Sequence, residues 1–239
     1  MLTSLPFLTP KHALFLDFDG TLAPIQDDPD SVSLPEGGAE VLLGLSEALS
    51  GALALISGRS VRDLGIRVPQ GVWRAGGHGL DICEPGEALP DTSGVAPVGM
   101  KEEIAAIVAP IEGARVEDKG AVFAIHYREA PLSGDLLQAQ LTDLLANYDG
   151  YAVQAGKRVL EAKPERAHKG KALSFLMTID PFKGRVPIMV GDDTTDEDAM
   201  RVARSAGGIA IKVGRGPTVA DFRVSEPRVI WGWLERGMK

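Results

Sequence analysis

Short apolar segments alternate with amphipathic segments at both ends of the chain. The apolar segments cover residues 13–18, 52–56, 186–190 and 207–213. Between them lie segments with apolar positions three or four residues apart, such as 35–50, which ends at Gly51. Alternation of buried strands with amphipathic helices is typical of a parallel sheet that carries helices on its faces. The pattern therefore predicts an α/β core.

Helices are also expected later in the chain and directly after the second apolar segment. The expected helices follow residues 57–60 and cover 169–177, 195–203 and 229–235. The last of these contains Trp231 and Trp233, which we expect in the hydrophobic core because aromatic side chains gain most from burial.

The middle of the chain has a different order of elements. Between residues 95 and 164 a helix precedes two strands, a second helix and two more strands. The later segments are 114–119, 121–128, 132–148, 151–155 and 157–163. Consecutive strands joined by short turns indicate an antiparallel sheet, here with two helices on one face. We therefore predict an inserted module, with domains at residues 1–94, 95–164 and 165–239, preceded by a polar, Gly- and Pro-containing linker at 84–94.

Composition and charge exclude several classes of function. The formal net charge of −8 argues against nucleic-acid binding, which needs a basic surface. No apolar run approaches the roughly 18 residues of a membrane span. The single cysteine, Cys83, cannot form an internal disulfide, and the N-terminus lacks the basic region of a signal peptide. We expect a cytoplasmic monomer that acts on a small molecule, without nucleic-acid or membrane partners.

Two carboxylates follow the first predicted strand, in the sequence Asp17-Phe18-Asp19-Gly20-Thr21. A hairpin turn is the alternative interpretation, because Asp-Gly is a strong turn signal. Residues two apart on a strand share a face, however, so Asp17 and Asp19 project together and repel unless a cation lies near them. Ligands of open α/β sheets bind beyond the carboxyl ends of the strands, which favours a functional role for this pair.

A second acidic segment, GDDTTDEDAM at 191–200, follows the strand predicted at 186–190. Thr194 and Glu197 match a capping box that would start the next helix. That box does not explain Asp192 and Asp193, which precede it. Acidic clusters at two strand ends predict an all-oxygen Mg²⁺ site, and zinc is disfavoured because the chain has neither HExxH nor a cysteine cluster.

Ser57 and Lys169 complete a set with one chemical use. Taken alone, Ser57 could simply cap a helix, and Lys169 could be a solvated helix lysine. Together with the aspartates they suit attack on a phosphate monoester. At an effective dielectric near 20, two like charges about 4 Å apart repel by about 4 kcal/mol. A carboxylate nucleophile therefore needs a divalent cation and a lysine to neutralise the phosphoryl oxygens.

The segments DFDGT, SGR, KGKA and GDDTTDED, in this order, resemble the haloacid dehalogenase-like superfamily of phosphatases. Longer stretches are similar to the trehalose-6-phosphate phosphatase family: LDFDGTLAPI, GALALISGRS, GGHGLDI, VEDKGAVFAIHYREAP, GKRVLEAKP and VGDDTTDEDAM. The resemblance covers nearly the whole chain. It implies a Rossmann-like core with an inserted α/β cap, and the hydrolysis of trehalose 6-phosphate to trehalose and phosphate.

The same resemblance implies roles for the motif residues. Asp17 would be the nucleophile that forms an aspartyl-phosphate, and Asp19 would be the general acid and then the general base. Ser57 and Lys169 would hold the phosphoryl oxygens. The implied magnesium site uses the Asp17 carboxylate, the Asp19 backbone carbonyl and Asp192, supported by Asp193 and Asp196.

Substrate-binding candidates lie in both parts of the chain. In the cap, the resemblance puts Glu117, Lys119 and Glu161 at positions that meet sugar hydroxyls. Arg128 and Lys157 are further candidates there, with a solvated sheet face as the alternative. In the core the candidates are Gly58, Arg59 and His78, where His78 could equally be a hydrogen-bonded core histidine.

Three residues leave alternatives open. His126 and Tyr127 fall in a predicted strand, where a structural role and substrate contact remain equal alternatives. His168 precedes Lys169 where members of the family often have a smaller polar residue, which puts the neighbourhood of the lysine in doubt.

Two other functions remain as hypotheses. A phosphatase of this superfamily could act on another sugar phosphate, such as sucrose 6-phosphate, mannosyl-phosphoglycerate or a hexose phosphate. A non-catalytic sugar-phosphate sensor could keep the fold, although such a sensor can lose a catalytic carboxylate or the lysine, and this chain has both.

Overall fold

The computed structural model describes residues 4–26, 28–89, 95–156 and 158–237. The chain divides into two compact units: a core unit, formed by residues 1–89 and 168–239, and an inserted unit, formed by residues 90–167. Each unit has its own cluster of buried apolar side chains. Within the described ranges, no helix has the length and apolar character needed to span a membrane.

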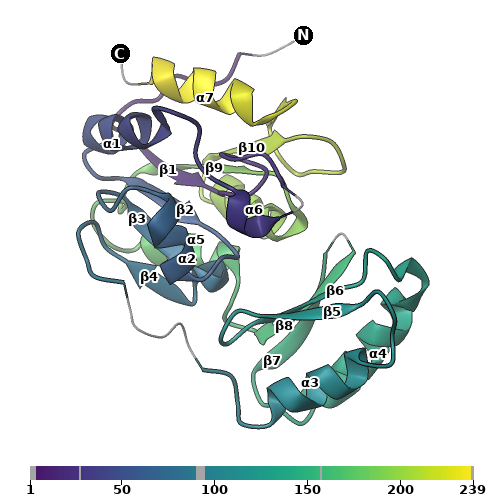
Figure 1. Ribbon diagram of the computed structural model, residues 1–239. Coiled ribbons are helices and arrows are strands. Elements are labelled where there is room, and N and C mark those ends of the chain that lie inside the picture. The colour runs from purple at the N-terminus through teal and green to yellow at the C-terminus, as the bar shows by residue number, and fades with distance from the viewer. Residues whose placement is uncertain (1–3, 27, 90–94, 157, 238–239) are drawn as a thin grey trace. The chain divides into compact units, whose positions relative to one another are not determined.

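The core unit contains a seven-stranded sheet with the strand order β11-β10-β9-β1-β2-β3-β4 (Figure 1). All neighbouring strands are parallel except β3 and β4, which are antiparallel. The strands are β1 (His12–Leu16), β2 (Leu53–Ile56), β3 (Trp73–Gly76), β4 (Asp81–Cys83), β9 (Val186–Gly191), β10 (Ile209–Val213) and β11 (Phe222–Val224). Because β1 lies between β9 and β2, the carboxyl ends of three strands meet at the middle of the sheet.

Helices connect the strands of this sheet. They are α1 (Gly38–Ala48), α2 (Val61–Arg67), α5 (Lys169–Leu176), α6 (Thr194–Ser205), α7 (Pro227–Arg236) and the short 3-10 helices η1 (Pro29–Ser31) and η2 (Gly77–Gly79). Helix α5 packs against α6, and α1 packs against α7. The predicted burial of both tryptophans of α7 is confirmed, and Trp231 Nε1 donates to the Leu22 carbonyl at 2.7 Å.

Three short strands, β3, β4 and β11, have no counterpart in the sequence prediction. Strands β4 and β11 have three residues each, which is too short to show a pattern. Strand β3 is fully buried but contains Arg74, whose guanidinium donates to the Glu84 and Glu87 carbonyls at 3.0 and 3.1 Å. With a charged residue among its four positions, the segment does not show the apolar pattern of a buried strand.

The inserted unit is a four-stranded antiparallel sheet, in the order β5-β6-β8-β7, with helices α3 and α4 along one face (Figure 1). Its elements are α3 (Met100–Val108), β5 (Arg115–Asp118), β6 (Phe123–His126), η3 (Pro131–Ser133), α4 (Gly134–Leu145), β7 (Tyr151–Ala155) and β8 (Val159–Pro164). This arrangement and the mostly parallel core sheet confirm the predicted fold class.

Candidate active site

The acidic side chains of the two strand ends converge in the core unit. Strands β1 and β9 pair in parallel with Leu16 opposite Val190, and Asp17 N donates to the Val190 carbonyl at 3.0 Å. Asp17 and the segment after β9 therefore leave the sheet side by side. Carboxylate oxygens of Asp17, Asp192 and Asp196 all lie within 4.8 Å of one another.

Lys169 is buried in direct contact with this group. It is the first residue of α5, and its Nζ donates to Asp17 Oδ1 at 2.6 Å and to Asp196 Oδ1 at 2.7 Å. The side chains of Lys169, Asp17 and Asp196 are only 3%, 5% and 0% exposed. Two segments 152 residues apart are thus joined by charge-assisted hydrogen bonds away from solvent.

Asp196 also fixes the start of α6. Its Oδ2 accepts hydrogen bonds from the backbone N–H groups of Asp192 and Asp193, at 3.0 and 2.9 Å. Asp193 is the N-cap and forms a capping box with Asp196. The predicted box of Thr194 and Glu197 is therefore wrong by one residue, because the helix begins at Thr194 and the residue before it takes the cap.

Two glycines provide the space that these carboxylates occupy. A Cβ at Gly20 would collide with the Asp192 carboxylate, and a Cβ at Gly191 would collide with the Asp196 side chain. Gly20 also has a φ of +78°, which favours glycine over residues with a side chain. The glycines of DFDGT and GDD are thus required by close packing around the acidic group.

The electrostatics of the group show an excess of negative charge. Burial raises the pKa of Asp17 well above its ordinary value, and Asp196 adds to the rise while Lys169 opposes it. Burial and the neighbouring Asp196 raise the pKa of Asp192 to about 7. Burial lowers the pKa of Lys169, but Asp17 and Asp196 raise it by more, so the lysine stays charged.

This donor set fits a divalent cation. The three carboxylates face one lysine. Burial is the main reason that the pKa values of Asp17 and Asp192 are raised, and repulsion from Asp196 adds to the rise. The ligand atoms are all oxygens, which hard cations such as Mg²⁺ prefer. Of the predicted ligands, Asp193 is the exposed helix cap and lies outside the group of three.

Lys212 is a buried residue of the site that sequence reasoning missed. It lies on β10 opposite Gly191 of β9, and its Nζ donates to the backbone carbonyl of Asp192. It also lies 3.5 Å from Glu197, and the two side chains are 5% and 9% exposed. The signal was available, because Lys212 interrupts an otherwise apolar predicted strand at 207–213.

The predicted residues Ser57, Gly58 and His78 meet at the ends of β2 and β3. Ser57 is buried, and its backbone carbonyl accepts from His78 N at 2.8 Å. The imidazole of His78 packs against Gly58, where an added Cβ would lie 2.8 Å from His78 Cε1. His78 has a left-handed φ of +58° and is 3% exposed. The structure thus brings these three predicted residues together.

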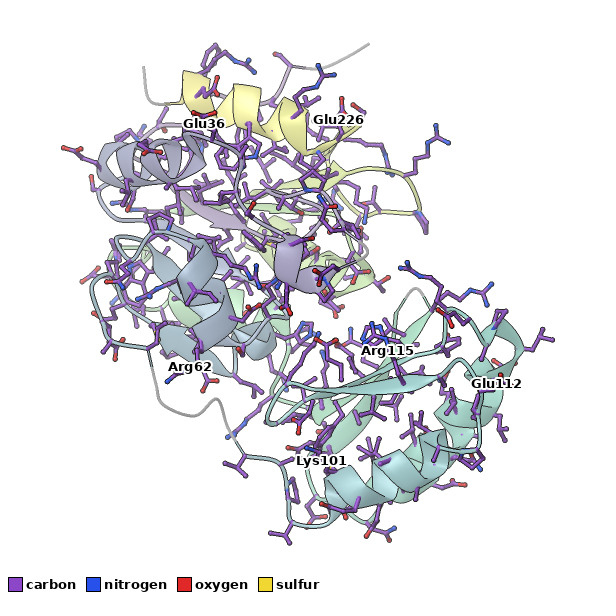
Figure 2. All side chains as sticks on the ribbon, in the orientation of Figure 1. Glu36, Arg62, Lys101, Glu112, Arg115 and Glu226 are labelled. Atoms are coloured by element: carbon purple, nitrogen blue, oxygen red, sulfur yellow. The ribbon has the colours of Figure 1, made fainter. Side chains whose placement is uncertain are left out.

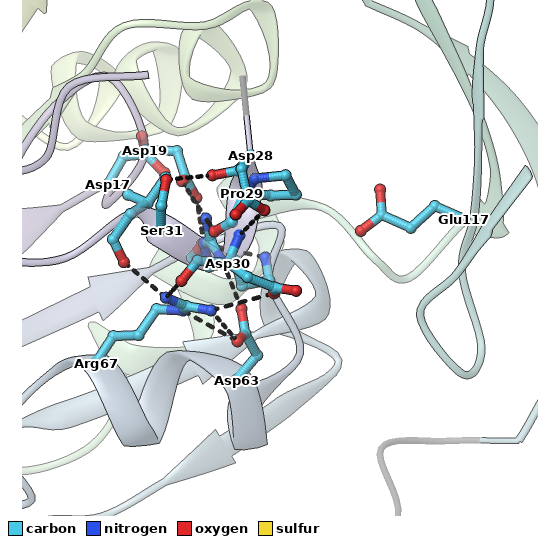
Figure 3. A network of polar contacts seen from close by, with 12 residues as sticks. Asp17, Asp19, Asp28, Pro29, Asp30, Ser31, Asp63, Arg67 and Glu117 are labelled. Atoms are coloured by element: carbon cyan, nitrogen blue, oxygen red, sulfur yellow. Dashed lines mark hydrogen bonds and ion pairs between the residues drawn. The ribbon is translucent and has the colours of Figure 1, made fainter. Parts of the chain in front are cut away.

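Arg59 binds the second carboxylate of the DFDGT segment. Its Nε and one terminal nitrogen donate to both Asp19 oxygens, at 2.8 and 2.7 Å. Asp19 remains 37% exposed, whereas Asp17 is buried. Two neighbours that sequence reasoning missed, Asp63 and Arg67, belong to the same polar network, and Figure 3 shows their side chains turned toward each other. Both lie on α2, four and eight residues after Arg59, and this spacing was the available signal.

His168 acts as the N-cap of α5. Its Nδ1 accepts from the backbone N–H groups of Gly170 and Lys171, at 3.1 and 3.3 Å. Its Nε2 lies 3.2 Å from Asp198 Oδ2, as expected for an N–H that donates to a carboxylate. An imidazole therefore replaces the smaller polar side chain that caps more often, and it fixes the first turn that carries Lys169.

The inserted unit presents polar side chains on the sheet face opposite its helices. Phe123, Ile125 and Leu160 pack toward α3 and α4, so alternate residues face the other way. That second face carries a row in register, Glu117 on β5, Ala124 on β6, Glu161 on β8 and Gln154 on β7. Figure 2 labels Arg115, which belongs to the same face.

Neighbouring side chains contact the two glutamates of this row. His126 Nε2 lies 2.8 Å from Glu117 Oε2, and Lys119 Nζ lies 3.6 Å from the same oxygen. The hydrogen bond from His126 lowers the pKa of Glu117 against the effect of burial. Lys163, which the sequence analysis did not select, lies 4.0 Å from Glu161.

Two other cap candidates have less structural context. Arg128 lies just beyond the end of β6, and Lys157 lies outside the described residues. The face as a whole offers paired acids and bases at a surface, which suits hydrogen bonding to hydroxyl groups.

Comparisons with known proteins give one consistent answer. A family model described as trehalose-phosphatase matches residues 15–228. Trehalose-6-phosphate phosphatase from Escherichia coli (strain K12) is 38% identical over 240 residues, which cover 98% of this chain and 89% of that protein.

Solved structures agree in fold. The C-terminal domain of trehalose-6-phosphate phosphatase from C. albicans has a TM-score of 0.83 at 22% identity, covering 96% of this chain and 92% of that one. A haloacid dehalogenase-like hydrolase from Bacteroides thetaiotaomicron has a TM-score of 0.62 at 18% identity, with coverage of 93% and 98%. The acidic group at the ends of β1 and β9, the matching family model and the similar curated relative lead to one assignment. The chain belongs to the trehalose-phosphatase family, a family of phosphoric monoester hydrolases.

Proposed function

We propose that this protein is a Mg²⁺-dependent phosphatase that hydrolyses trehalose 6-phosphate to trehalose and phosphate through an aspartyl-phosphate on Asp17. One observation carries the chemistry: a group of three carboxylates at the carboxyl ends of β1 and β9, of which Asp17 and Asp196 are buried and bonded to Lys169. The substrate is supported by the family model and by the name of the Escherichia coli relative.

The residues that would hold Mg²⁺ are those of the acidic group. Asp17 and Asp192 would supply carboxylate oxygens and Asp19 its backbone carbonyl, while Asp193 and Asp196 would support them by holding the start of α6. When bound, the ion would neutralise phosphoryl oxygens and orient the phosphate. Lys212 would help by holding the backbone carbonyl of Asp192 and thereby its orientation.

Asp17 attacks phosphorus, and its surroundings suit that role. Lys169 binds Asp17 Oδ1 and so fixes the carboxylate. The same ammonium group offsets part of the repulsion between a carboxylate and a phosphate dianion, about 4 kcal/mol for unit charges at about 4 Å and an effective dielectric near 20. Ser57, at the neighbouring strand end, supplies a hydroxyl for a phosphoryl oxygen.

Asp19 transfers the proton. In its protonated form it donates a proton to the sugar oxygen as the P–O bond breaks. The carboxylate that remains then takes a proton from the water that attacks the aspartyl-phosphate, which restores the protonated form. Its greater exposure supports this role, since a group that serves both the sugar and water has to be reachable from solvent. In this proposal the buried Asp17 is the nucleophile and the more exposed Asp19 transfers the proton.

The inserted unit selects the sugar in this proposal, as a cap predicted at residues 95–164. Its polar sheet face offers Glu117 and Glu161 to the hydroxyl groups, together with Lys119 beside Glu117, and Arg128 is near in sequence. Ala124 separates the two glutamates, whose strands are two steps apart, so their Cα atoms are about 10 Å apart. That span suits a sugar ring held from two sides. The cytoplasmic location and the monomeric state stay predictions.

The test is phosphate release from trehalose 6-phosphate beside sucrose 6-phosphate, glucose 6-phosphate and mannosyl-phosphoglycerate, each in Mg²⁺ and in EDTA. We expect preference for trehalose 6-phosphate and loss of all activity in EDTA. Preference for another sugar phosphate would refute the assigned substrate but leave the chemistry. Tight binding without phosphate release in Mg²⁺ would instead support a sensor.

A further inference from the structure

The carboxylate of Asp19 is held by more than one residue. Arg59 binds both of its oxygens in a bidentate pair, which fixes the plane of the carboxylate as well as its position. Each carboxylate oxygen has two lone pairs, so one lone pair per oxygen remains for the proton that Asp19 transfers, or for a hydrogen bond from a substrate or water. The pair therefore orients Asp19 without occupying it.

Arg59 is itself fixed on several sides. A terminal nitrogen donates to Asp63 Oδ2 at 2.6 Å, and the other terminal nitrogen also reaches the Pro29 carbonyl at 2.9 Å. The guanidinium carbon lies 5.5 Å from the ring centre of Phe18, in a cation–π contact. The side chain is 10% exposed. These bonds use most of the donors of Arg59 within its own unit, so it is poorly placed to serve mainly as a substrate ligand.

Asp63 has a second partner that anchors the network. Its Oδ1 accepts from Arg67 Nε and from an Arg67 terminal nitrogen, at 3.0 and 2.8 Å. Arg67 also donates to the carbonyls of Asp30 and Val32, at 3.0 and 2.6 Å. The network thus runs from α2 to the segment after DFDGT, whose labelled residues Figure 3 shows around Asp19.

The contacts of Asp63 and Arg59 favour the charged form of both side chains. Burial raises the pKa of Asp63, but hydrogen bonds from Arg67 and Arg59 outweigh it, and the pKa lies below its ordinary value. Burial lowers the pKa of Arg59, while the hydrogen bonds to Asp19 and Asp63 raise it by more. Asp63 and Arg59 are therefore both charged at neutral pH, and neither is free to turn away without leaving an unpaired charge behind.

We propose that Asp63 and Arg59 form a positioning chain that holds the Asp19 carboxylate in the orientation needed for proton transfer. This inference rests on the proposed role of Asp19. Arg59 acts through the Asp19 carboxylate that it binds, and Asp63 acts only through Arg59. The alternative is a purely structural pair, since Arg59, Asp63 and Arg67 are spaced four residues apart. Helix pairing alone does not explain why Arg59 reaches across 40 residues to both oxygens of Asp19.

The chain predicts a loss that depends on the leaving group. A sugar alkoxide leaves slowly unless it receives a proton, whereas p-nitrophenolate leaves without one. Misorienting Asp19 should therefore slow transfer from a sugar phosphate and spare the first step with p-nitrophenyl phosphate. A structural defect at the site would slow both steps alike.

The experiment compares Asp63→Asn with Glu47→Gln, a control that removes the same charge from an exposed position on α1. We expect Asp63→Asn to lower kcat on trehalose 6-phosphate by about 10- to 100-fold, with KM changed by less than about threefold. The burst of p-nitrophenol, which reports the first step alone, should stay within about threefold of the unsubstituted protein. Glu47→Gln should change none of these values.

A double-mutant cycle separates positioning from structure. In an Asp19→Ala background, Asp63→Asn should cause no further loss, because the residue through which it acts is gone. Arg59→Lys, which keeps the charge but cannot bind both oxygens, should reproduce the effect of Asp63→Asn, and it carries the test if Asp63→Asn does not fold. Unchanged kcat in both variants, or an equal loss in the Asp19→Ala background, would overturn the proposal.

Failure of the proposed substrate is distinguishable from failure of this inference. If trehalose 6-phosphate is not hydrolysed, the same comparison is made with whichever sugar phosphate the protein hydrolyses fastest. The leaving-group contrast then tests the positioning chain alone.

Discussion

The acidic group of the core unit and the polar sheet face of the inserted unit use the same residue types under opposite conditions. In the core, Lys169, Asp17 and Asp196 are 3%, 5% and 0% exposed and lie within 2.7 Å of their partners. On the sheet face, Lys119 and Glu117 are 24% and 31% exposed and lie 3.6 Å apart.

The difference teaches how each site works. Buried charges are costly unless they are paired, so the bonds of Lys169 hold Asp17 and Asp196 in one geometry, which suits the proposed attack on phosphorus. Partly exposed charges form weaker pairs that can exchange one partner for another at less cost. Such pairs suit hydroxyl groups, which replace water and neighbouring side chains one hydrogen bond at a time.

The largest expected effect comes from removing the nucleophile. Asp17→Asn should lower kcat by roughly 10⁴-fold or more on every phosphate ester, because no other carboxylate replaces it. The fold should persist, since Lys169 keeps Asp196 as a partner. Steady-state kinetics and circular dichroism check both points, and activity near that of the unsubstituted protein would remove the mechanism.

Metal removal should come next in size. EDTA should lower activity by about 100-fold or more, and Mg²⁺ should restore it. Mg²⁺ at about 100 times its dissociation constant should also stabilise the folded protein by about 2.7 kcal/mol. Calorimetry checks this, with Asp192→Asn as the variant that should lose the stabilisation. Full activity in EDTA would contradict the proposed metal site in the core unit.

Changing a side chain of the polar sheet face should affect only the binding of the sugar. Glu117→Gln should raise KM for trehalose 6-phosphate by about tenfold, the cost of one charge-assisted hydrogen bond, and leave hydrolysis of p-nitrophenyl phosphate unchanged. Asp143→Asn, at an exposed position of α4 in the same unit, is the matched control. An equal loss on both substrates would show that the two regions do not divide the work.

The two regions should also respond to pH with opposite signs. Burial raises the pKa of Asp17, and it raises the pKa of Asp192 to about 7. The stability that Asp192 contributes while it is protonated is therefore lost as pH rises from its ordinary pKa through about 7. Hydrogen bonding from His126 lowers the pKa of Glu117 against burial, so its contribution disappears only as pH falls below its ordinary range.

Between about pH 4 and pH 7 the metal-free protein should therefore lose several degrees of melting temperature as pH rises, because this range separates the ordinary pKa of Asp192 from its raised pKa. Thermal unfolding in EDTA measures this, and Asp192→Asn should flatten the trend. A melting temperature that rises with pH across this range would refute the assignment of the raised pKa values.

The smallest effect concerns the helix that carries Lys169. His168→Ala removes the N-cap of α5 and should lower the free energy of unfolding by about 1 kcal/mol, while His168→Asn should keep most of it. Chemical denaturation measures both. If His168→Ala matched the unsubstituted protein in stability, the imidazole would not act as a cap.

Sequence alone was sufficient where chemistry follows from topology. Parallel strands bring their carboxyl ends to one edge of the sheet, so Asp17 and Asp192 could be predicted to meet. The prediction holds although the paired residues of β1 and β9, such as His12 and Val186, are 174 residues apart in the sequence. The strand β3 could not be recognised, because Arg74 interrupts it and finds its acceptors only in the folded chain.

Side-chain contacts between distant elements were beyond the sequence. Nothing in the spacing shows that Arg59 turns to Asp19 or that Lys212 reaches the Asp192 carbonyl, since both depend on side-chain direction in the folded core. The capping box of α6 shows the same limit, because it uses Asp193 and Asp196 and so lies one residue before the pair that the sequence predicted.

The most direct test of the central claim is to trap the phosphoryl group on Asp17. An Asp19→Asn variant, which lacks the base for the second step, is mixed with p-nitrophenyl phosphate and Mg²⁺, quenched in acid and analysed by peptide mass spectrometry. We predict a phosphoryl group on the peptide that contains Asp17 and none in the Asp17→Asn, Asp19→Asn double variant. Release of p-nitrophenol with no phosphorylated peptide, or with phosphate on another residue, would contradict the account.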